Sequence, residues 1–175
     1  MMNKVFEIIE AKKIFDVPYS NLSILIHPNS YVHALLEFNN GLVKVIIHDT
    51  TMKIPIFNTL YDDGDKIIKS QKLNIKKLNN LNLSTVDQQK FPLIKTLKIL
   101  PKNDSLFETL LVSANDELVN LFLQKKIKYL DISKKLLKFI KKKEFQKLKL
   151  RSPQYVSEII NLNKYVRFKI KTKGI

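Results

Sequence analysis

Residues 1–15 read MMNKVFEIIEAKKIF, and the spacing of their apolar side chains predicts a helix from Met2 to about Phe15. At about 100° per residue, one face of this helix carries Asn3, Lys4 and Glu7, which offer an amide, an ammonium and a carboxylate. A helix holds such groups rigidly, and the combination suits a phosphate group or a metal ion. The opposite face is apolar and should lie against a core: Val5, Ile8, Ile9 and Phe15.

The same polar face has a simpler interpretation. Lys4 and Glu7 are three positions apart, and such pairs on helices are usually solvated ion pairs worth a few tenths of a kcal/mol. On the helix alone we favour this second interpretation, so the choice depends on the rest of the chain.

Downstream of the helix the pattern changes to short strands. Residues 24–26 predict a short buried strand, and the runs at 31–38 and 42–47 predict two longer ones. Asn39-Asn40-Gly41 separates the longer runs, and Asn-Gly between apolar runs is a strong hairpin signal. The second of them is almost wholly apolar apart from Lys44, so we expect it to be central in its sheet.

A short helical segment and a break follow the hairpin. Pro55 lies in a short helical stretch that reaches Leu60, and Asp62-Asp63-Gly64-Asp65 interrupts the pattern. Residues 73–83 fit an extended connecting segment that can return a strand to the first sheet.

The remainder of the chain is predicted to be helical. Helices are expected over 91–100 and 106–124, the second of them broken at Ser113-Ala114-Asn115. Asp131 or Ser133 can cap a third helix, and Ser152-Pro153 starts a fourth. The inward face of this fourth helix is predicted to be Tyr155, Val156, Ile159 and Ile160.

These patterns predict an α+β fold. A helix and a small mixed sheet with an Asn-Gly hairpin are followed by a C-terminal four-helix bundle. We place the substrate and metal part of a catalytic domain at 1–60, a connecting segment at 61–90 and the helical bundle at 91–175.

The composition excludes several classes of protein. The 175 residues contain no cysteine, so disulfides and thiolate metal sites are excluded. No apolar run approaches the roughly 20 residues that span a bilayer, and the start lacks the long apolar segment of a signal peptide. We therefore expect a soluble cytoplasmic protein without a membrane partner.

The net charge is +15, which favours polyanions such as nucleic acid, anionic membranes or phosphorylated metabolites. Nucleic-acid readers usually use arginine forks and stacking aromatic side chains, whereas Arg151 and Arg167 are the only arginines and tryptophan is absent. We favour a solvated basic surface. A non-enzymatic basic module that binds nucleic acid or another polyanion stays as one alternative, and a helical interaction domain without a ligand as another.

The candidate residues for chemistry are few. Only three glycines occur, all isolated, which excludes the usual glycine-rich nucleotide-binding loop within these residues. His27 and His33 flank Pro28-Asn29-Ser30, and a packing role is favoured for both. His48-Asp49 is a weak candidate for a metal pair.

Further residues connect the opening helix to a known family. Residues 2–4 (MNK), Glu7 and residues 9–11 (IEA) resemble the MNKGLExIEA helix of the 1-deoxy-D-xylulose 5-phosphate reductoisomerase family. Residues 26–33, IHPNSYVH, resemble the IHPQSxxH motif of the same family.

Later segments extend the resemblance. Gly41 matches the glycine of the family's DGS turn, and residues 52–56, MKIPI, resemble MRTPI. Phe91-Pro92 resembles the YP pair, and residues 114–117, ANDE, resemble AANE. The segments follow the family order with nearly the family spacing and cover most of the chain, so the ordered set is specific although each motif alone is weak.

The resemblance implies an activity and a site. The family converts 1-deoxy-D-xylulose 5-phosphate to 2-C-methyl-D-erythritol 4-phosphate by a rearrangement and an NADPH-dependent reduction, with Mg or Mn, in the non-mevalonate isoprenoid pathway. Asn3, Lys4 and Glu7 are implied to bind the phosphosugar substrate, Lys4 and Glu7 to be catalytic, and Glu7 to bind the metal. Met52 and His33 are implied to lie on the cofactor side of the pocket.

The chain also departs from the family pattern. The family's N-terminal NADPH-binding domain and two further acidic metal ligands are absent, Val5 replaces a glycine, and residues 48–51 replace most of a GEPD motif. We expect an isolated chain that is inactive. It is either a fragment of a longer protein or a decayed product, and we favour the fragment. The intact protein is expected to be a homodimer, and the isolated chain to associate through its sheet edge and apolar faces.

Overall fold

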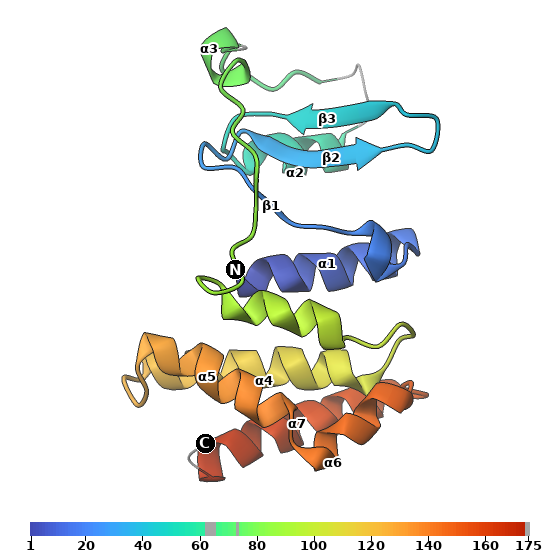
Figure 1. Ribbon diagram of the computed structural model, residues 1–175, viewed down its shortest axis with the longest axis vertical. Helices are drawn as coiled ribbons and strands as arrows, with labels where there is room; N and C mark the ends of the chain where they lie inside the picture. The colour runs from blue at the N-terminus through green and yellow to red at the C-terminus, as the bar shows by residue number, and fades with distance from the viewer. Residues whose placement is uncertain (62–65, 73, 174–175) are drawn as a thin grey trace. The chain divides into compact units, whose positions relative to one another are not determined.

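A computed structural model of the chain describes residues 1–61, 66–72 and 74–173, and within these residues it contains helices and two small antiparallel sheets (Figure 1). The α+β class is therefore confirmed. The predicted break at residues 62–65 lies outside the described residues. The chain divides into two units, which consist of residues 1–24 with 86–175, and of residues 25–85.

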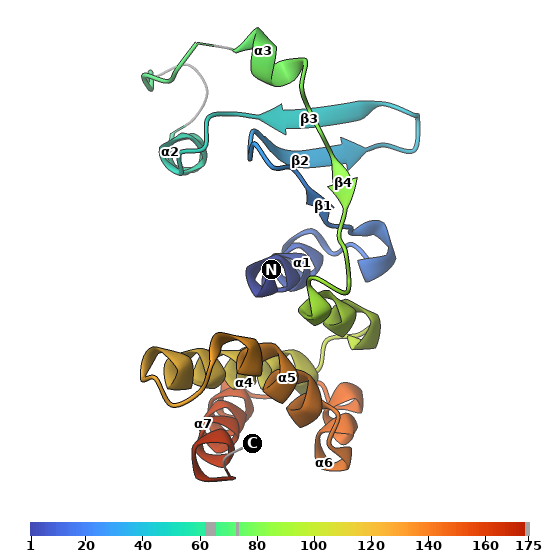
Figure 2. The ribbon, with the colours of Figure 1, turned by 60° about the vertical axis from the view of Figure 1, so that its left-hand side comes forward.

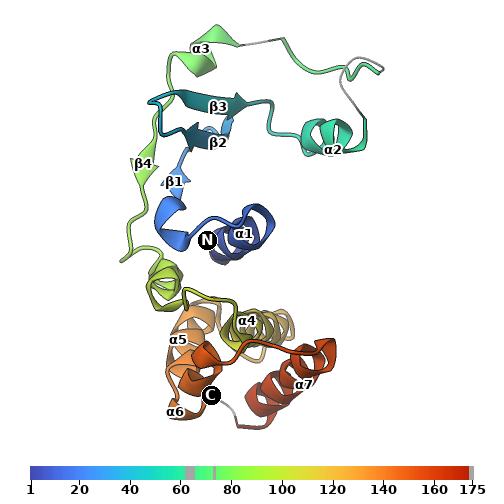
Figure 3. The same ribbon diagram turned by 90° about the vertical axis from the view of Figure 1, so that its right-hand side faces the viewer.

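The first unit is helical. α4 is its central helix and contacts α5, α6 and α7, and α1 packs on η2 (Figure 3). None of the helices within the described residues is long and apolar enough to cross a membrane. The helices and 3-10 turns of this unit are α1 (Met2–Phe15), η1 (Tyr19–Asn21), η2 (Pro92–Ile99), α4 (Leu106–Leu123), α5 (Tyr129–Ile140), α6 (Lys143–Gln146), η3 (Lys147–Leu150) and α7 (Val156–Lys173).

α1 has the predicted bounds and mostly the predicted faces. Val5 is fully buried and belongs to the core of the helical unit, together with Met2 and Ile9. The prediction that Phe15 faces the core is wrong, because its side chain is 71% exposed. The helix ends directly after it, where Asp16 takes a left-handed conformation with φ 51°.

α4 is one continuous helix, so the predicted break at residues 113–115 is wrong. Ser113, Ala114 and Asn115 are all buried, and burial against neighbouring helices outweighs the weaker helix propensity of Ser113 and Asn115. The helix begins where the Ser105 hydroxyl accepts the backbone N–H of Phe107 at 3.0 Å.

α5 begins at Tyr129, before both predicted caps, and its N-cap residue is Lys128. The carboxylate of Asp131 accepts the backbone N–H of Lys128 at 2.9 Å, so Asp131 acts from within the first turn of the helix. Ser133 lies inside the helix, where its hydroxyl donates to the carbonyl of Leu130.

The predicted inward face of α7 is also wrong. The N-terminal positions Tyr155 and Val156 are each 72% exposed, and Val166 and Ile170 are the buried positions instead. The period of the apolar residues is helical along the whole segment, but only its C-terminal half is covered by the core.

The second unit contains the strands. β1 pairs with β4 in antiparallel register, with Leu25 opposite Thr85 (Figure 2). β2 and β3 form the predicted hairpin, whose turn places Gly41 at φ +81°, a conformation that favours glycine. The elements are β1 (Leu25–Ile26), β2 (Val32–Glu37), β3 (Val43–Ile47), α2 (Lys53–Leu60), α3 (Ile75–Leu78) and β4 (Ser84–Thr85).

Two expectations about the sheet are corrected. Each pairing in the described residues is antiparallel and two-stranded, so the sheet is not mixed and β3 is not central. Val43, Val45 and Ile46 are 53%, 44% and 48% exposed, and among the described strands only β2 pairs with β3. An apolar strand predicts a position that other elements cover, but the strand itself does not determine which elements lie against it.

The units differ from the predicted segments. α1 belongs with the C-terminal helices, whereas the sequence places it with residues 1–60. Residues 25–85 leave and rejoin the helical unit through β1 and β4. The functional assignment of residues 1–60, 61–90 and 91–175 stays a prediction.

Candidate functional site

The polar face of α1 is arranged as the helical period predicts. Asn3, Lys4 and Glu7 are exposed, while Val5 between them is buried. Lys4 Nζ lies 2.6 Å from Glu7 Oε2, so the cation and the carboxylate are already side by side. The buried face fixes the helix in the core, and the polar groups are therefore held on a rigid support.

This ion pair is easily replaced by a ligand. The side chains of Lys4 and Glu7 are 54% and 53% exposed. Exposed pairs of this kind contribute about 0–1 kcal/mol, so opening the pair costs little. A phosphate can then take the ammonium as a point charge, and a hard cation can take the carboxylate oxygens.

The described residues do not form a complete metal site. No group of three or more His, Asp or Glu side chains within them could hold a metal ion. Glu7 offers one carboxylate, which is too few ligands for Mg²⁺ by itself. Three isolated glycines also provide no phosphate-binding loop for a dinucleotide. The described residues by themselves therefore provide neither a complete metal site nor a dinucleotide site.

His33 lies on β2 in the second unit and stacks on His48. The two ring centroids are 3.5 Å apart with an interplanar angle of 5°. His33 Nε2 lies 3.1 Å from the carbonyl oxygen of His48, and His48 Nδ1 lies 2.6 Å from that of Asp49. These contacts fold the segment after β3 on the hairpin, so the packing role favoured for His33 fits its surroundings.

The Asp49 carboxylate does not turn toward the imidazoles. Its oxygens lie 3.3 Å from the backbone nitrogen of Gln71 and 3.9 Å from Lys77 Nζ. The geometry therefore gives no support to His48-Asp49 as a metal pair.

Met52 is the N-cap residue of α2, and its side chain is 69% exposed. Like His33, it belongs to the second unit, whereas Asn3, Lys4 and Glu7 belong to the first. The structure thus brings the three α1 residues together and holds the two implied cofactor residues in the other unit. Their roles stay predictions.

Sequence reasoning missed the ion pairs that anchor the end of α1. Lys12 and Lys13 lie 3.2 and 2.9 Å from the Asp104 carboxylate. The hydrogen bond from Lys13 is the main reason why the pKa of Asp104 is below its usual value. Asp104 is 91 positions from Lys13 in the chain, and no local pattern indicates such a partner.

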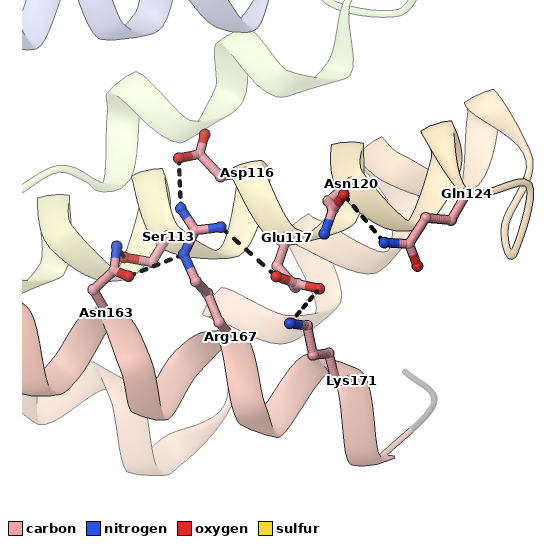
Figure 4. A network of polar contacts seen from close by, with 8 residues as sticks. All are labelled: Ser113, Asp116, Glu117, Asn120, Gln124, Asn163, Arg167 and Lys171. Atoms are coloured by element: carbon pink, nitrogen blue, oxygen red, sulfur yellow. Dashed lines mark hydrogen bonds and ion pairs between the residues drawn. The ribbon is translucent and has the colours of Figure 1, made fainter.

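A polar network between α4 and α7 was also missed (Figure 4). Arg167 donates to Asn163 Oδ1 at 2.9 Å and to Asp116 Oδ2 at 3.0 Å. Its Nη1 lies 3.7 Å from Glu117 Oε2, and Lys171 Nζ lies 3.7 Å from the other oxygen of Glu117. The Glu117 side chain is only 1% exposed, so two cations compensate one buried carboxylate. The polar run at residues 115–117 inside an apolar helix was the available signal.

Comparison with known proteins gives a consistent result. The family model described as "DXP reductoisomerase C-terminal domain" matches residues 48–169. The 1-deoxy-D-xylulose 5-phosphate reductoisomerase of Pelagibacter ubique is 57% identical over 175 residues, which are 100% of this chain and 45% of that protein. The enzyme of the same name from Aquifex aeolicus is 33% identical over 98% of this chain and 44% of its own length.

Solved structures agree with these relatives. The Zymomonas mobilis reductoisomerase in complex with NADPH aligns with a TM-score of 0.84 at 26% identity, over 99% of this chain and 44% of that one. A DOX-P reductoisomerase structure with fosmidomycin and magnesium also has a TM-score of 0.84, at 28% identity and the same coverage. The chain therefore spans less than half the length of the proteins it matches.

Proposed function

Because the chain belongs to the 1-deoxy-D-xylulose 5-phosphate reductoisomerase family, we propose that it forms the C-terminal part of such an enzyme. That enzyme would convert 1-deoxy-D-xylulose 5-phosphate to 2-C-methyl-D-erythritol 4-phosphate with NADPH, in the non-mevalonate isoprenoid pathway. The chain's share of the site would be the polar face of α1.

The geometry of α1 is the observation that carries this proposal. Asn3 and Lys4 would bind hydroxyl and phosphate groups of the phosphosugar. Glu7 would supply one oxygen ligand to Mg²⁺ or Mn²⁺ and contact the substrate, and the remaining ligands would come from outside the described residues. The exposed Lys4–Glu7 pair supports these roles, because both charges are already positioned and neither is committed to a buried partner.

His33 and Met52 would line the pocket on the side of the nicotinamide cofactor. Support comes from their place in the ordered motifs and from a solved relative that is a complex with NADPH. The NADPH itself would be bound by the part of the enzyme that this chain does not match.

The assembled enzyme would be a cytoplasmic homodimer. The apolar strands β2 and β3 support this, since Leu36, Val43 and Val45 are each between 43% and 53% exposed and invite a covering partner. The isolated chain would be inactive, because its described residues contain neither a group of side chains that could hold a metal ion nor a dinucleotide-binding loop.

The test is to rebuild a full-length enzyme. This chain would be joined to the part of the Pelagibacter relative that it does not match, at the aligned position, and NADPH oxidation would be followed with 1-deoxy-D-xylulose 5-phosphate and Mg²⁺. We expect turnover by the hybrid and none by the chain alone. A hybrid that folds and binds NADPH but does not consume the substrate would contradict the proposal.

A further inference from the structure

The turn between α4 and α5 presents apolar side chains to solvent. Leu123 ends α4 and is 70% exposed, and Tyr129 and Leu130 begin α5 and are 71% and 66% exposed. Two backbone hydrogen bonds close the turn, from Lys125 to Phe122 and from Lys126 to Leu121. Together these residues form a fixed apolar tip, which we define as Leu123, Tyr129 and Leu130.

Lysines surround this apolar tip. Residues 125–143 contain nine lysines and one aspartate, a net charge of +8 out of the +15 of the whole chain. Lys134 and Lys138 of α5, and Lys141 directly after it, follow Leu130 on the exposed side of the helix at steps of three or four residues. We call these three residues the lysine row. Among the described residues, none of these three lysines lies in an ion pair, so the positive charge of this face is not neutralised.

The remaining face of α5 is committed to the core. Ile132, Leu136, Phe139 and Ile140 are all buried. The helix therefore cannot turn its own apolar face outward, and a partner meets only the apolar tip and the lysine row. Any occupant must combine anionic groups with a shallow apolar layer.

We propose that the apolar tip and the lysine row of α5 bind the surface of a membrane that contains anionic lipids. A bilayer interface accepts a few apolar side chains at the level of the headgroups, and anionic lipids attract nearby lysines. A protein partner is less suited, because a stable interface takes about 20–30 residues a side, and three apolar side chains are a small part of that. Nucleic acid would contact the lysines through its phosphates and Tyr129 through base stacking, but it would form no comparable contact with the two exposed leucines.

This contact differs from spanning a membrane. The expectation that the chain has no membrane partner rested on the absence of a long apolar run, and this proposal departs from it at the membrane surface only. It is also independent of the proposed activity, since none of these residues belongs to the α1 site.

The experiment measures cosedimentation of the whole chain with large unilamellar vesicles. Vesicles of phosphatidylcholine alone would be compared with vesicles that contain roughly one-third phosphatidylglycerol, at low and at physiological salt. We expect binding to the anionic vesicles only, weakened by salt. Lys134→Gln, Lys138→Gln and Lys141→Gln together should weaken it about a hundredfold, since each lysine near an anionic surface contributes roughly a fivefold effect.

Two further variants separate the parts of the proposal. Leu123→Ser with Leu130→Ser should weaken binding about tenfold and remove the part that resists salt. Lys69→Gln, Lys72→Gln and Lys76→Gln remove the same charge from exposed positions in the other unit and should leave binding unchanged. Circular dichroism and thermal unfolding would verify that each variant is folded.

Three outcomes would overturn the proposal. One is a lack of binding to anionic vesicles by the folded chain. Another is an equal loss in the charge-matched control, which would reduce the effect to net charge. The third is tighter binding to a single-stranded oligonucleotide that survives the leucine changes, which would assign the face to nucleic acid.

Discussion

At the scale of single residues, the helical period decides what the sequence can reveal. It predicted that Asn3, Lys4 and Glu7 share the exposed face of α1 and that Val5 is buried, and the structure confirms these positions. It could not reveal that Lys12 and Lys13 form ion pairs with Asp104, because these ion pairs depend on packing between segments that are distant in the sequence.

The Asp104 ion pairs should make the thermal stability of the protein depend on pH. Because Lys13 and Lys12 lower the pKa of Asp104 below 3.8, its contribution to stability is complete above that pH and disappears as the pH falls through the lowered value. Asp104→Asn should reduce the Tm by about 2 °C at pH 7, and the difference should shrink below pH 4.

Thermal unfolding by circular dichroism at several pH values would measure this effect. Glu37→Gln is the matched control, since it removes an exposed carboxylate that has no ion pair among those found in the described residues. A difference for Asp104→Asn that stays constant down to pH 3 would show that the ion pairs are not its cause.

At the scale of elements, the existence of the helices was predictable and their environment was not. The pattern over residues 106–124 predicted a helix with a break at residues 113–115, whereas the helix is continuous. Ser113 accepts a hydrogen bond from Asn163 of α7, and Arg167 of the same helix meets Asp116 and Glu117. The sequence of one helix does not indicate which of its polar residues will contact a polar residue on another helix.

The α4–α7 network predicts strong coupling between Glu117 and Arg167. Arg167→Met should cost about 2–3 kcal/mol of unfolding free energy, because it leaves the buried Glu117 carboxylate with Lys171 as its one ion-pair partner among the described residues. Adding Glu117→Gln should recover part of this loss, since the uncompensated charge is then removed.

Chemical denaturation of the two single variants and the double variant gives this coupling directly. Arg151→Met is the control, because its partner Glu158 is more exposed than Glu117 and the change should cost less than about 1 kcal/mol. Additive costs for Glu117 and Arg167 would contradict a compensated buried charge.

At the scale of the whole molecule, the sequence order does not reveal the grouping of the elements. The core of the helical unit contains buried residues from α1 and from the C-terminal helices, and none from the described part of residues 25–85. The sequence suggested the fold class and the hairpin. It missed that residues 25–85 are inserted between two parts of one helical core, because that grouping depends on long-range contacts.

This grouping predicts that the helical unit can fold without the hairpin unit. Ile26 pairs with Ser84, so replacing residues 27–83 by Asn-Gly would join β1 and β4 through a two-residue turn. The shortened chain should keep its helical circular dichroism and unfold cooperatively. Loss of cooperative unfolding would mean that the helical core depends on the second unit.

The proposed role of Glu7 is tested most directly in the hybrid enzyme. NADPH oxidation would be measured against Mg²⁺ concentration for Glu7→Gln and for Glu10→Gln, an exposed glutamate on the same helix. Loss of a direct metal ligand should lower turnover by about a hundredfold or more and raise the Mg²⁺ requirement, while Glu10→Gln should behave like the unchanged hybrid. Full activity of Glu7→Gln at the same Mg²⁺ concentration would contradict the assignment of Glu7 as the metal ligand that α1 supplies.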